Sequence, residues 1–196
     1  MTGRPTIDME GEGVRSLLTE LGRRIAARGL RAEMFVVGGA AMALVYDDRR
    51  TTVDIDAILR PRDVVLDEAA TMAEEMGLPA RWLNDAVAEM MPPVDDQSPR
   101  TVGEFGGLSV SVGSPEYLLA MKAMVSRKSP SDLEDAARLC VTLGIADERK
   151  VERIVRRYFG PAPVGSQELW FEDIIERAAT LARDQDAKGE SDEPKS

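Results

Sequence analysis

A short apolar run that ends in two glycines is the feature that most constrains the fold of this chain. Met34 to Val37 has the length and composition of a buried strand, and Gly38-Gly39 follow it directly. A helical stretch from Ala40 to Val45 comes next, and a second strand is predicted from Thr52 to Leu59. Strands and helices therefore alternate closely, which is typical of a sheet with helices packed against it.

The rest of the chain extends this pattern. Apolar periodicity predicts helices from about Val14 to Arg28 and from Asp63 to Met76, and a third strand near Leu108 to Val112. After that strand only helices are predicted, over residues 114–125, 131–143, 148–159 and 167–183. The second of these begins with Ser131-Asp132-Leu133-Glu134, which has the form of a capping box.

We therefore predict an α/β (α+β) fold, in which a small mixed sheet is flanked by helices and followed by a helical C-terminal half. Three parts are expected. Residues 1–113 form the core with the Gly-Gly and Asp-x-Asp motifs, and residues 114–183 form a helical region. Residues 184–196 are polar and mostly acidic, and are predicted to be a disordered tail.

The absence of histidine removes several kinds of active site. The 196 residues include no His and a single Cys, Cys140. Ser-His-Asp and Cys-His catalysis and His-containing zinc sites are thus excluded. A lone cysteine has no disulfide partner in the chain and builds no cysteine-cluster metal site. Any catalysis must rest on carboxylates with a hard metal, on Lys, or on Ser and Thr hydroxyls.

The sequence predicts neither a membrane span nor an exported segment. Its longest apolar run, Met34 to Tyr46, is interrupted by Gly38-Gly39 and is too short to cross a bilayer. The first residues lack the basic and then apolar order of a signal peptide. A single cysteine also suits a reducing compartment. We therefore expect a cytoplasmic protein with no membrane partner.

Two acidic residues are the strongest candidates for chemistry. Asp54 and Asp56 are two apart on a predicted strand, so both carboxylates should project from one face. Carboxylates so close repel each other unless a cation lies between them, and Mg²⁺ prefers such oxygen ligands. Upstream, Gly38-Gly39 leave room for a phosphate to approach backbone N–H groups. The opposite strand face is predicted to pack on the core through Val53, Ile55 and Ala57.

Each motif alone has an ordinary structural explanation. An isolated Asp-x-Asp is usually a solvated strand edge, and a lone Gly-Gly is usually a turn. The order of apolar strand, Gly-Gly, helix, short basic link and Thr-Val-Asp-Ile-Asp is much more specific.

That order resembles the polymerase-β-type nucleotidyltransferase superfamily. The strings FVVGGAAMALVYDDRRTTVDIDAIL, WLND, SPEYLLAMKAMVSRK and SDLEDAARL are more similar still to the AbiEii-like nucleotidyltransferases. That branch includes toxins of bacterial, notably mycobacterial-type, toxin–antitoxin systems. The resemblance covers about Met34 to Leu143. It implies a nucleotidyltransferase fold, one or two Mg²⁺ ions and a nucleoside triphosphate (NTP) substrate. It also implies transfer of pyrimidine nucleotides to the 3′ end of tRNA, which blocks translation, and a cognate antitoxin as partner.

The resemblance assigns roles to individual residues of the core. Asp54 and Asp56 match the metal-binding catalytic carboxylates. Gly38 and Gly39 match the loop that holds the triphosphate. The family often places phosphate-contacting groups just before the acidic pair, at positions that here hold Arg49, Arg50, Thr51 and Thr52.

Three residues of the helical half join the site only through the resemblance. Lys122 matches a helix lysine that reaches the triphosphate, and Asp132 and Asp135 match a downstream catalytic Asp-x-x-Asp. Taken alone, Lys122 reads as an ordinary surface lysine. Asp132 next to an N-cap serine favours the helix dipole without any catalytic role.

The chain departs from the family pattern in two places. The predicted strand Leu108 to Val112 lacks the third carboxylate, and Ser131 stands where the downstream motif usually has Arg. The AbiEii-like branch often lacks the third carboxylate too. The group that deprotonates the attacking hydroxyl is therefore left open.

A net charge of −10 argues against indiscriminate nucleic-acid coating, yet basic side chains gather on one face of the helix predicted over residues 148–159. Such a face is usually solvated, but it also suits an RNA backbone. The predicted RNA contacts are Arg127, Lys128, Arg149, Lys150, Arg153, Arg156 and Arg157. The aromatic residues Trp82, Trp170 and Phe171 are predicted to lie in the core rather than to stack on bases.

Three functions fit the sequence. The first is a nucleotidyltransferase toxin that acts on tRNA. The second is a nucleotidyltransferase that modifies a small molecule, such as an antibiotic, or a protein hydroxyl. The third is a catalytically dead nucleotidyltransferase fold that serves as a binding protein. The intact Asp54 and Asp56 count against the third function, while the missing strand carboxylate and Ser131 keep it open.

Overall fold

The computed structural model describes residues 8–47, 49–161 and 168–191. The chain divides into two compact units. The first unit contains Met1–Met91 and Asp96–Ser114, and the second contains Pro92–Asp95 and Pro115–Ser196.

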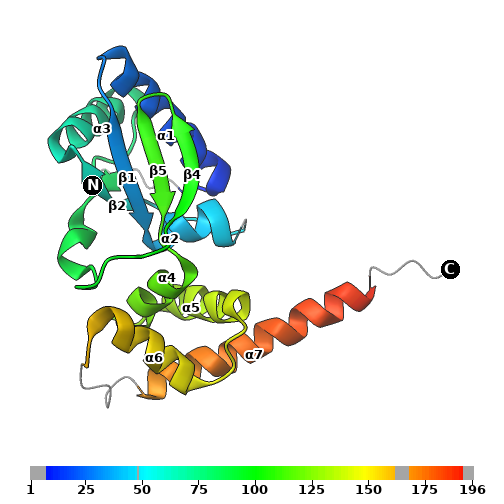
Figure 1. Ribbon diagram of the computed structural model, residues 1–196. Coiled ribbons are helices and arrows are strands. Elements are labelled where there is room, and N and C mark those ends of the chain that lie inside the picture. The colour runs from blue at the N-terminus through cyan, green and yellow to red at the C-terminus, as the bar shows by residue number, and fades with distance from the viewer. Residues whose placement is uncertain (1–7, 48, 162–167, 192–196) are drawn as a thin grey trace, which may run out of the picture. The chain divides into compact units, whose positions relative to one another are not determined.

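Within the described residues, the first unit is built on a five-stranded mixed sheet in the order β3-β2-β1-β5-β4 (Figure 1). The central strand β1 is antiparallel to β2 and parallel to β5. At the edges, β3 runs parallel to β2 and β4 runs antiparallel to β5. The strands are β1 (Ala32–Val37), β2 (Ile55–Arg60), β3 (Leu83–Asn84), β4 (Arg100–Phe105) and β5 (Leu108–Val112). The predicted α/β fold class is confirmed.

Helices α1 (Gly11–Ala27) and α3 (Arg62–Met76) pack against the sheet and against each other, so they lie on the same face (Figure 1). The alternation of the strands explains this, because every second residue of β2 and of β5 is buried. The side chains that α1 contributes to this core are fully buried: Val14, Leu18, Leu21 and Ile25. The other set of alternate residues, which includes Asp56, points to the opposite face.

The link between β1 and β2 differs from the single predicted helix. A short α-helix, α2 (Gly38–Ala41), continues as a π-helical turn, η1 (Met42–Tyr46). Residues outside the turn hold it in place. Arg15 Nη2 of α1 donates to the Leu44 carbonyl oxygen at 3.0 Å. In addition, the Tyr46 hydroxyl donates to the Gly113 carbonyl oxygen at 2.8 Å.

Two strands were not predicted. β4 is an edge strand whose side chains are largely exposed, so its sequence has no apolar alternation. Its pairing with β5 also shifts register between Thr101 and Gly103. β3 is only two residues long, and a 3₁₀-helix, η2 (Ala86–Met90), follows it. Neither strand carries a periodic signal of its own.

The second unit is helical. Its helices are α4 (Pro115–Ala123), α5 (Pro130–Leu143), α6 (Glu148–Phe159) and α7 (Glu168–Ser191). α5 packs against α4 and α7, and α6 packs against α4. Trp170 and Phe171 of α7 are buried, as predicted. No helix in the described ranges is long and apolar enough to span a membrane.

Two predictions for this unit are corrected. α5 begins at Pro130, and its N-cap is Ser129 rather than Ser131, because the Ser129 hydroxyl accepts the Asp132 N–H. α7 continues to Ser191 through the segment predicted to be a disordered tail from Asp184. A helix that is already nucleated extends readily through residues of adequate helix propensity, even when they are polar. Residues 192–196 of the predicted tail lie outside the described residues.

Candidate functional site

The two acidic residues of the Thr-Val-Asp-Ile-Asp motif lie at the start of β2, but only Asp56 belongs to the strand. Asp56 pairs with Val37 at the end of β1, whereas Asp54 lies in the bend before β2. The prediction of one regular strand from Thr52 is therefore wrong. Thr52 instead exchanges backbone hydrogen bonds of 2.7 and 2.9 Å with Met9. Val53, predicted to face the core, is 47% exposed.

Two buried side chains lie near Asp54, and one of them bonds to its backbone. Thr52 Oγ1 donates to the backbone carbonyl oxygen of Asp54 at 2.9 Å. The buried side chain of Asn84 lies near the Asp54 carboxyl and lowers its pKa. Because the Thr52 side chain is almost inaccessible to solvent, its hydrogen bond helps to define the position of the bend.

The surroundings of Asp54 both raise and lower the pKa of its carboxyl. Burial raises the pKa of the Asp54 carboxyl above its ordinary value, because the ionised form has lost part of its hydration. The positive charge of Arg81 and the side chain of Asn84 oppose that rise. A cation bound at this carboxylate would replace the lost hydration.

Gly38 and Gly39 bring the chain close to these residues. Gly38 has φ +65°, in the left-handed region that glycine tolerates best. A Cβ on Gly38 would lie 3.3 Å from Asp56 Oδ2, and one on Gly39 would lie 2.9 Å from Thr52 Oγ1. Gly38 thus avoids crowding Asp56, and Gly39 avoids crowding Thr52 and Arg50.

The structure also locates the remaining predicted phosphate contacts. The Arg50 guanidinium donates to the Thr51 carbonyl oxygen, and its Nη2 lies 3.2 Å from the position of a Cβ on Gly39. Arg49 is exposed, and its backbone N–H donates to Asp47 Oδ1 at 3.2 Å. Arg50 is therefore the arginine beside the Gly-Gly loop, while the Thr52 side chain is occupied by Asp54.

Asp54 and Asp56 fit a magnesium ion in ligand chemistry. Their carboxylate oxygens are the donors that Mg²⁺ prefers, and Gly38 adds no Cβ beside Asp56 Oδ2. No cluster of three or more metal-ligating side chains occurs in the part of the chain that the structure describes. Where the third strand carboxylate is missing, β5 has Ser109 and Ser111. A metal here would complete its shell with water and substrate phosphate oxygens.

Asn84 and Arg81 were not assigned to the site from the sequence. The available signal was the string Trp82-Leu83-Asn84-Asp85, which is one of the strings that carry the family resemblance. In the structure the Ile55 N–H donates to the Trp82 carbonyl oxygen at 2.7 Å, and Asn84 pairs with Asp56. A parallel pairing of only two residues has no periodic pattern that would reveal it.

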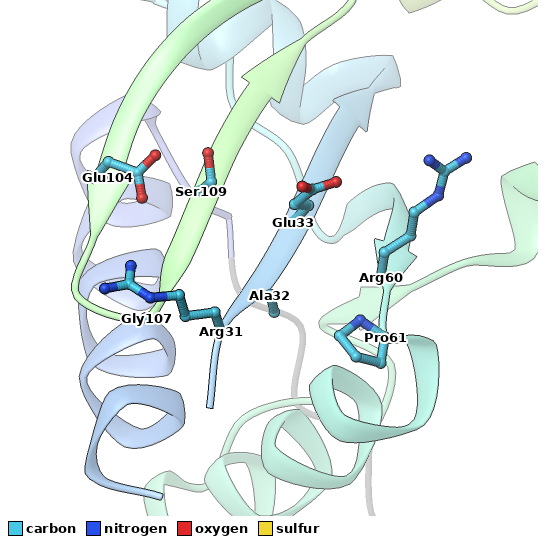
Figure 2. Close-up of a pocket in the computed structure, with 8 residues that line it drawn as sticks. All are labelled: Arg31, Ala32, Glu33, Arg60, Pro61, Glu104, Gly107 and Ser109. Atoms are coloured by element: carbon cyan, nitrogen blue, oxygen red, sulfur yellow. The ribbon is translucent and has the colours of Figure 1, made fainter. Parts of the chain in front are cut away.

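A separate cavity of about 580 Å³ lies beside the N-terminal end of β1. Its lining residues are Arg31, Ala32, Glu33, Arg60, Pro61, Glu104, Gly107 and Ser109 (Figure 2). None of the predicted site residues is among them. Arg60 is four residues beyond Asp56 on β2, which corresponds to about 13 Å along a strand.

In the second unit, Lys122, Asp132 and Asp135 form one ion-pair cluster. Lys122 Nζ lies 2.7 Å from Asp132 Oδ1 and 3.0 Å from Asp135 Oδ2. The Lys122 side chain is only 11% exposed and that of Asp135 is fully buried, so Lys122 is no ordinary surface lysine. Ser129 Oγ adds a hydrogen bond of 2.6 Å to Asp132 Oδ2.

The cluster keeps Asp132 ionised. Burial alone would raise the pKa of the Asp132 carboxyl. The hydrogen bonds from Lys122 and Ser129 and the charge of Lys122 outweigh burial, so this pKa lies below its ordinary value.

The basic residues of α6 are exposed, and the apolar residues opposite them are buried. Arg156 is paired with Glu152 at 2.7 Å, and Arg157 is paired with Glu116. The other three basic residues of this face are Arg149, Lys150 and Arg153, and their side chains have no ion-pair partner among the described residues.

The other two predicted RNA contacts, Arg127 and Lys128, are also exposed. Lys128 Nζ lies 5.1 Å from the centre of the Trp170 ring, within the range of a cation–π contact.

A family model described as "Nucleotidyltransferase of unknown function (DUF6036)" matches residues 15–158. This span contains all the predicted site residues. No curated protein and no solved structure matches the chain.

Proposed function

The chain belongs to this family of nucleotidyltransferases, and from that premise we propose that it is a Mg²⁺-dependent toxin that transfers nucleotides from an NTP to the 3′ end of tRNA. The family assignment supports nucleotidyl transfer in general. The tRNA acceptor, a pyrimidine nucleotide, the metal and membership of the AbiEii-like toxin branch with a cognate antitoxin are the parts that we propose.

One observation carries the proposal: Asp56 lies beside Gly38, which adds no side chain next to Asp56 Oδ2, and Asp54 lies two residues before it. In the reaction, an acceptor hydroxyl oxygen bonds to the α-phosphorus, the bond from that phosphorus to pyrophosphate breaks, and the hydroxyl proton is released. A Mg²⁺ ion held by the two carboxylates would offset the charge of the phosphates. The remaining requirement is positioning, for which no histidine is needed.

The exposed basic face of α6 supports a polyanionic acceptor. Arg149, Lys150 and Arg153 have no ion-pair partner within the described residues and present their charge to solvent. Guanidinium and ammonium groups bind phosphates by charge and hydrogen bonding, so this face suits an RNA backbone better than a small neutral acceptor.

The direct test uses each of the four α-³²P-labelled NTPs separately, with purified protein, Mg²⁺ and total tRNA. We expect label on tRNA with the wild type and none with an Asp54→Ala/Asp56→Ala control. Label on the protein itself or on a small molecule would replace tRNA by another acceptor. The absence of transfer from any NTP to any of these acceptors would contradict the enzymatic proposal.

Replacing Gly38 with Ala should damage the site more than the fold. The left-handed backbone costs alanine about 1–2 kcal/mol, and the new Cβ would crowd Asp56 Oδ2. We expect kcat/KM for the NTP to fall about 10- to 100-fold, as misplaced substrates typically cause.

Gly77→Ala is the matched control. Gly77 has φ +67°, and nothing lies within 4 Å of its hypothetical Cβ. The same backbone penalty should therefore lower stability without lowering transfer. Equal losses of activity in both variants would show that backbone strain alone causes the effect of Gly38→Ala.

Charge reversal on α6 should weaken the use of tRNA. We expect the variant Arg149→Glu/Lys150→Glu/Arg153→Glu to raise the KM for tRNA about 10-fold, with the KM for NTP unchanged. If these residues contact phosphates, the slope of log affinity against log salt should become shallower by about 2–3. The double variant Arg156→Gln/Arg157→Gln should have the smaller effect, because those arginines already have carboxylate partners. An unchanged salt slope in the triple variant would make this face an ordinary solvated surface.

A further inference from the structure

The Gly-Gly loop belongs to a segment that has little stability of its own. Gly38 and Gly39 open α2, which has four residues, and η1 adds five more before Asp47. Helices this short are marginal in water and persist only when the rest of the protein holds them. Glycine also has more backbone freedom than any other residue. The position of the loop therefore depends on contacts that the rest of the segment makes.

Tyr46, the last residue of η1, connects the segment back to the place where it begins. Its hydroxyl donates to the Gly113 carbonyl oxygen at 2.8 Å. The Gly113 N–H in turn donates to the Val36 carbonyl oxygen at 3.1 Å, and Val36 lies in β1 two residues before Gly38. Two hydrogen bonds through Gly113 thus close the chain from Val36 to Tyr46 into a ring that contains the Gly-Gly loop.

The surroundings of Tyr46 favour this hydrogen bond. The side chain is half-buried, and the Arg100 guanidinium lies 5.4 Å from the centre of its ring, within the range of a cation–π contact. Gly113 is buried, and a buried carbonyl that loses its partner is unfavourable because water does not readily replace that partner. The bond therefore contributes to holding the end of η1 against the strands.

We infer that Tyr46 is a positioning residue that holds the Gly-Gly loop in the conformation that receives the triphosphate of the NTP. The inference rests on the proposed nucleotidyl transfer. Arg15 tethers the middle of η1 to α1, whereas Tyr46 connects its end to the strands beside the loop. Tyr46 acts through the backbone, without touching the nucleotide, by raising the fraction of molecules whose loop is ready to bind. π-Helical turns such as η1 are frequent at functional sites.

The test compares the wild type with Tyr46→Phe, which removes the hydroxyl and keeps the ring beside Arg100. Loss of one hydrogen bond typically changes an equilibrium about 2- to 10-fold, and apparent affinity falls with the fraction of binding-competent molecules. We expect the Kd and the KM for the NTP to rise about 3- to 10-fold. Bound nucleotide restores the loop, so kcat at saturating NTP should stay within about twofold of the wild type. Without nucleotide, amide hydrogen exchange over residues 38–46 should become faster.

Tyr158→Phe is the matched control, because it removes a tyrosine hydroxyl from the buried face of α6 in the second unit. It should leave the KM for the NTP and the exchange over residues 38–46 unchanged. A general loss of stability lowers kcat by reducing the amount of folded enzyme and does not change KM. A lower kcat with unchanged KM in Tyr46→Phe would therefore give Tyr46 a purely structural role and overturn the inference. Wild-type exchange over residues 38–46 in that variant would also overturn it.

Direct binding separates this inference from the proposed reaction. Isothermal titration calorimetry measures the affinity of each NTP with Mg²⁺ for the same three proteins. Binding that weakens in Tyr46→Phe, in a protein that transfers no nucleotide, would sustain the inference and reject the proposed reaction. Unchanged affinity in Tyr46→Phe would overturn the inference and leave the reaction standing. A wild type that binds no NTP would overturn both.

Discussion

Replacing Asp56 with Ala should abolish nucleotidyl transfer and leave the protein folded. Asp56 is anchored in β2 beside the Gly38 turn, and its proposed metal offsets charge on the reacting phosphates. Loss of several kcal/mol of transition-state stabilisation corresponds to a decrease in kcat of about 10³-fold or more. The backbone pairing of β2 with β1 does not involve the side chain, so the thermal midpoint should change little. Single-turnover transfer and thermal unfolding of the same preparation measure both effects.

Glu33→Ala provides the matched control for this experiment. Glu33 is an exposed carboxylate on β1 that pairs with Arg60, so it lies on the same sheet face as Asp56 but lines the separate cavity (Figure 2). Loss of this negative charge should leave transfer within about twofold of the wild type. Full activity in Asp56→Ala, or an equal loss in Glu33→Ala, would contradict the assignment of Asp56 as a metal ligand.

Replacing Lys122 with Met should strongly destabilise the second unit. The ammonium group lies within 3.0 Å of both carboxylates of the cluster, and the Asp135 side chain is fully buried. Removing one partner of a buried ion pair typically costs about 3–5 kcal/mol, because it leaves buried charge without compensation. For a chain of this size that cost corresponds to a decrease in thermal midpoint of about 10 °C. Lys150→Met, at an exposed position on α6, should leave the midpoint almost unchanged.

The destabilisation should depend on pH. The pKa of Asp132 lies below its ordinary value of 3.8, so its stabilising contribution is fully present above that value and is lost as pH falls through the folded-state pKa. Lys122→Met removes the main partner that lowers this pKa. The difference in unfolding free energy between wild type and variant should therefore be constant near neutral pH and should shrink below about pH 4. A difference that persists unchanged in acid would contradict the ion-pair explanation.

Elements with a strong periodic pattern could be predicted from the sequence. α6 begins and ends at the predicted residues, because apolar and basic side chains segregate completely on its two faces. β1 and β5 were located for the same kind of reason, since each alternates or runs apolar between clear breaks. The short edge strands β3 and β4 were missed, because their pairing depends on neighbouring strands rather than on their own composition.

In the candidate site too, some features could be predicted from the local sequence and others depend on residues that are distant in the sequence. Residue identity sufficed to name Asp54, Asp56 and the Gly-Gly loop. The bend at Asp54 could not be predicted, because it follows from the pairing of Thr52 with Met9, which is distant in sequence. The position of Asn84 next to Asp56 depends on a fold that brings β3 next to β2.

The helical half also has features that the local sequence did not predict. The two carboxylates that pair with Lys122 belong to the next helix, α5, so the residues around Lys122 in its own helix did not distinguish it from a surface lysine. The N-cap of α5 was placed at Ser131, although Ser129 forms the bond, because both serines precede Asp132. Local composition did not distinguish the two.

Cys140 makes the native chain suitable for site-specific labelling. It is the sole cysteine of the sequence, and burial raises the pKa of its thiol to about 12. Maleimides and related reagents attack the thiolate, so this thiol should stay unmodified at neutral pH without being replaced. A cysteine introduced at exposed Val53 would carry a fluorophore next to Asp54 and signal the arrival of a metal ion. A second one at Lys150 would signal the arrival of RNA, so both ligands could be followed by fluorescence in an otherwise unaltered protein.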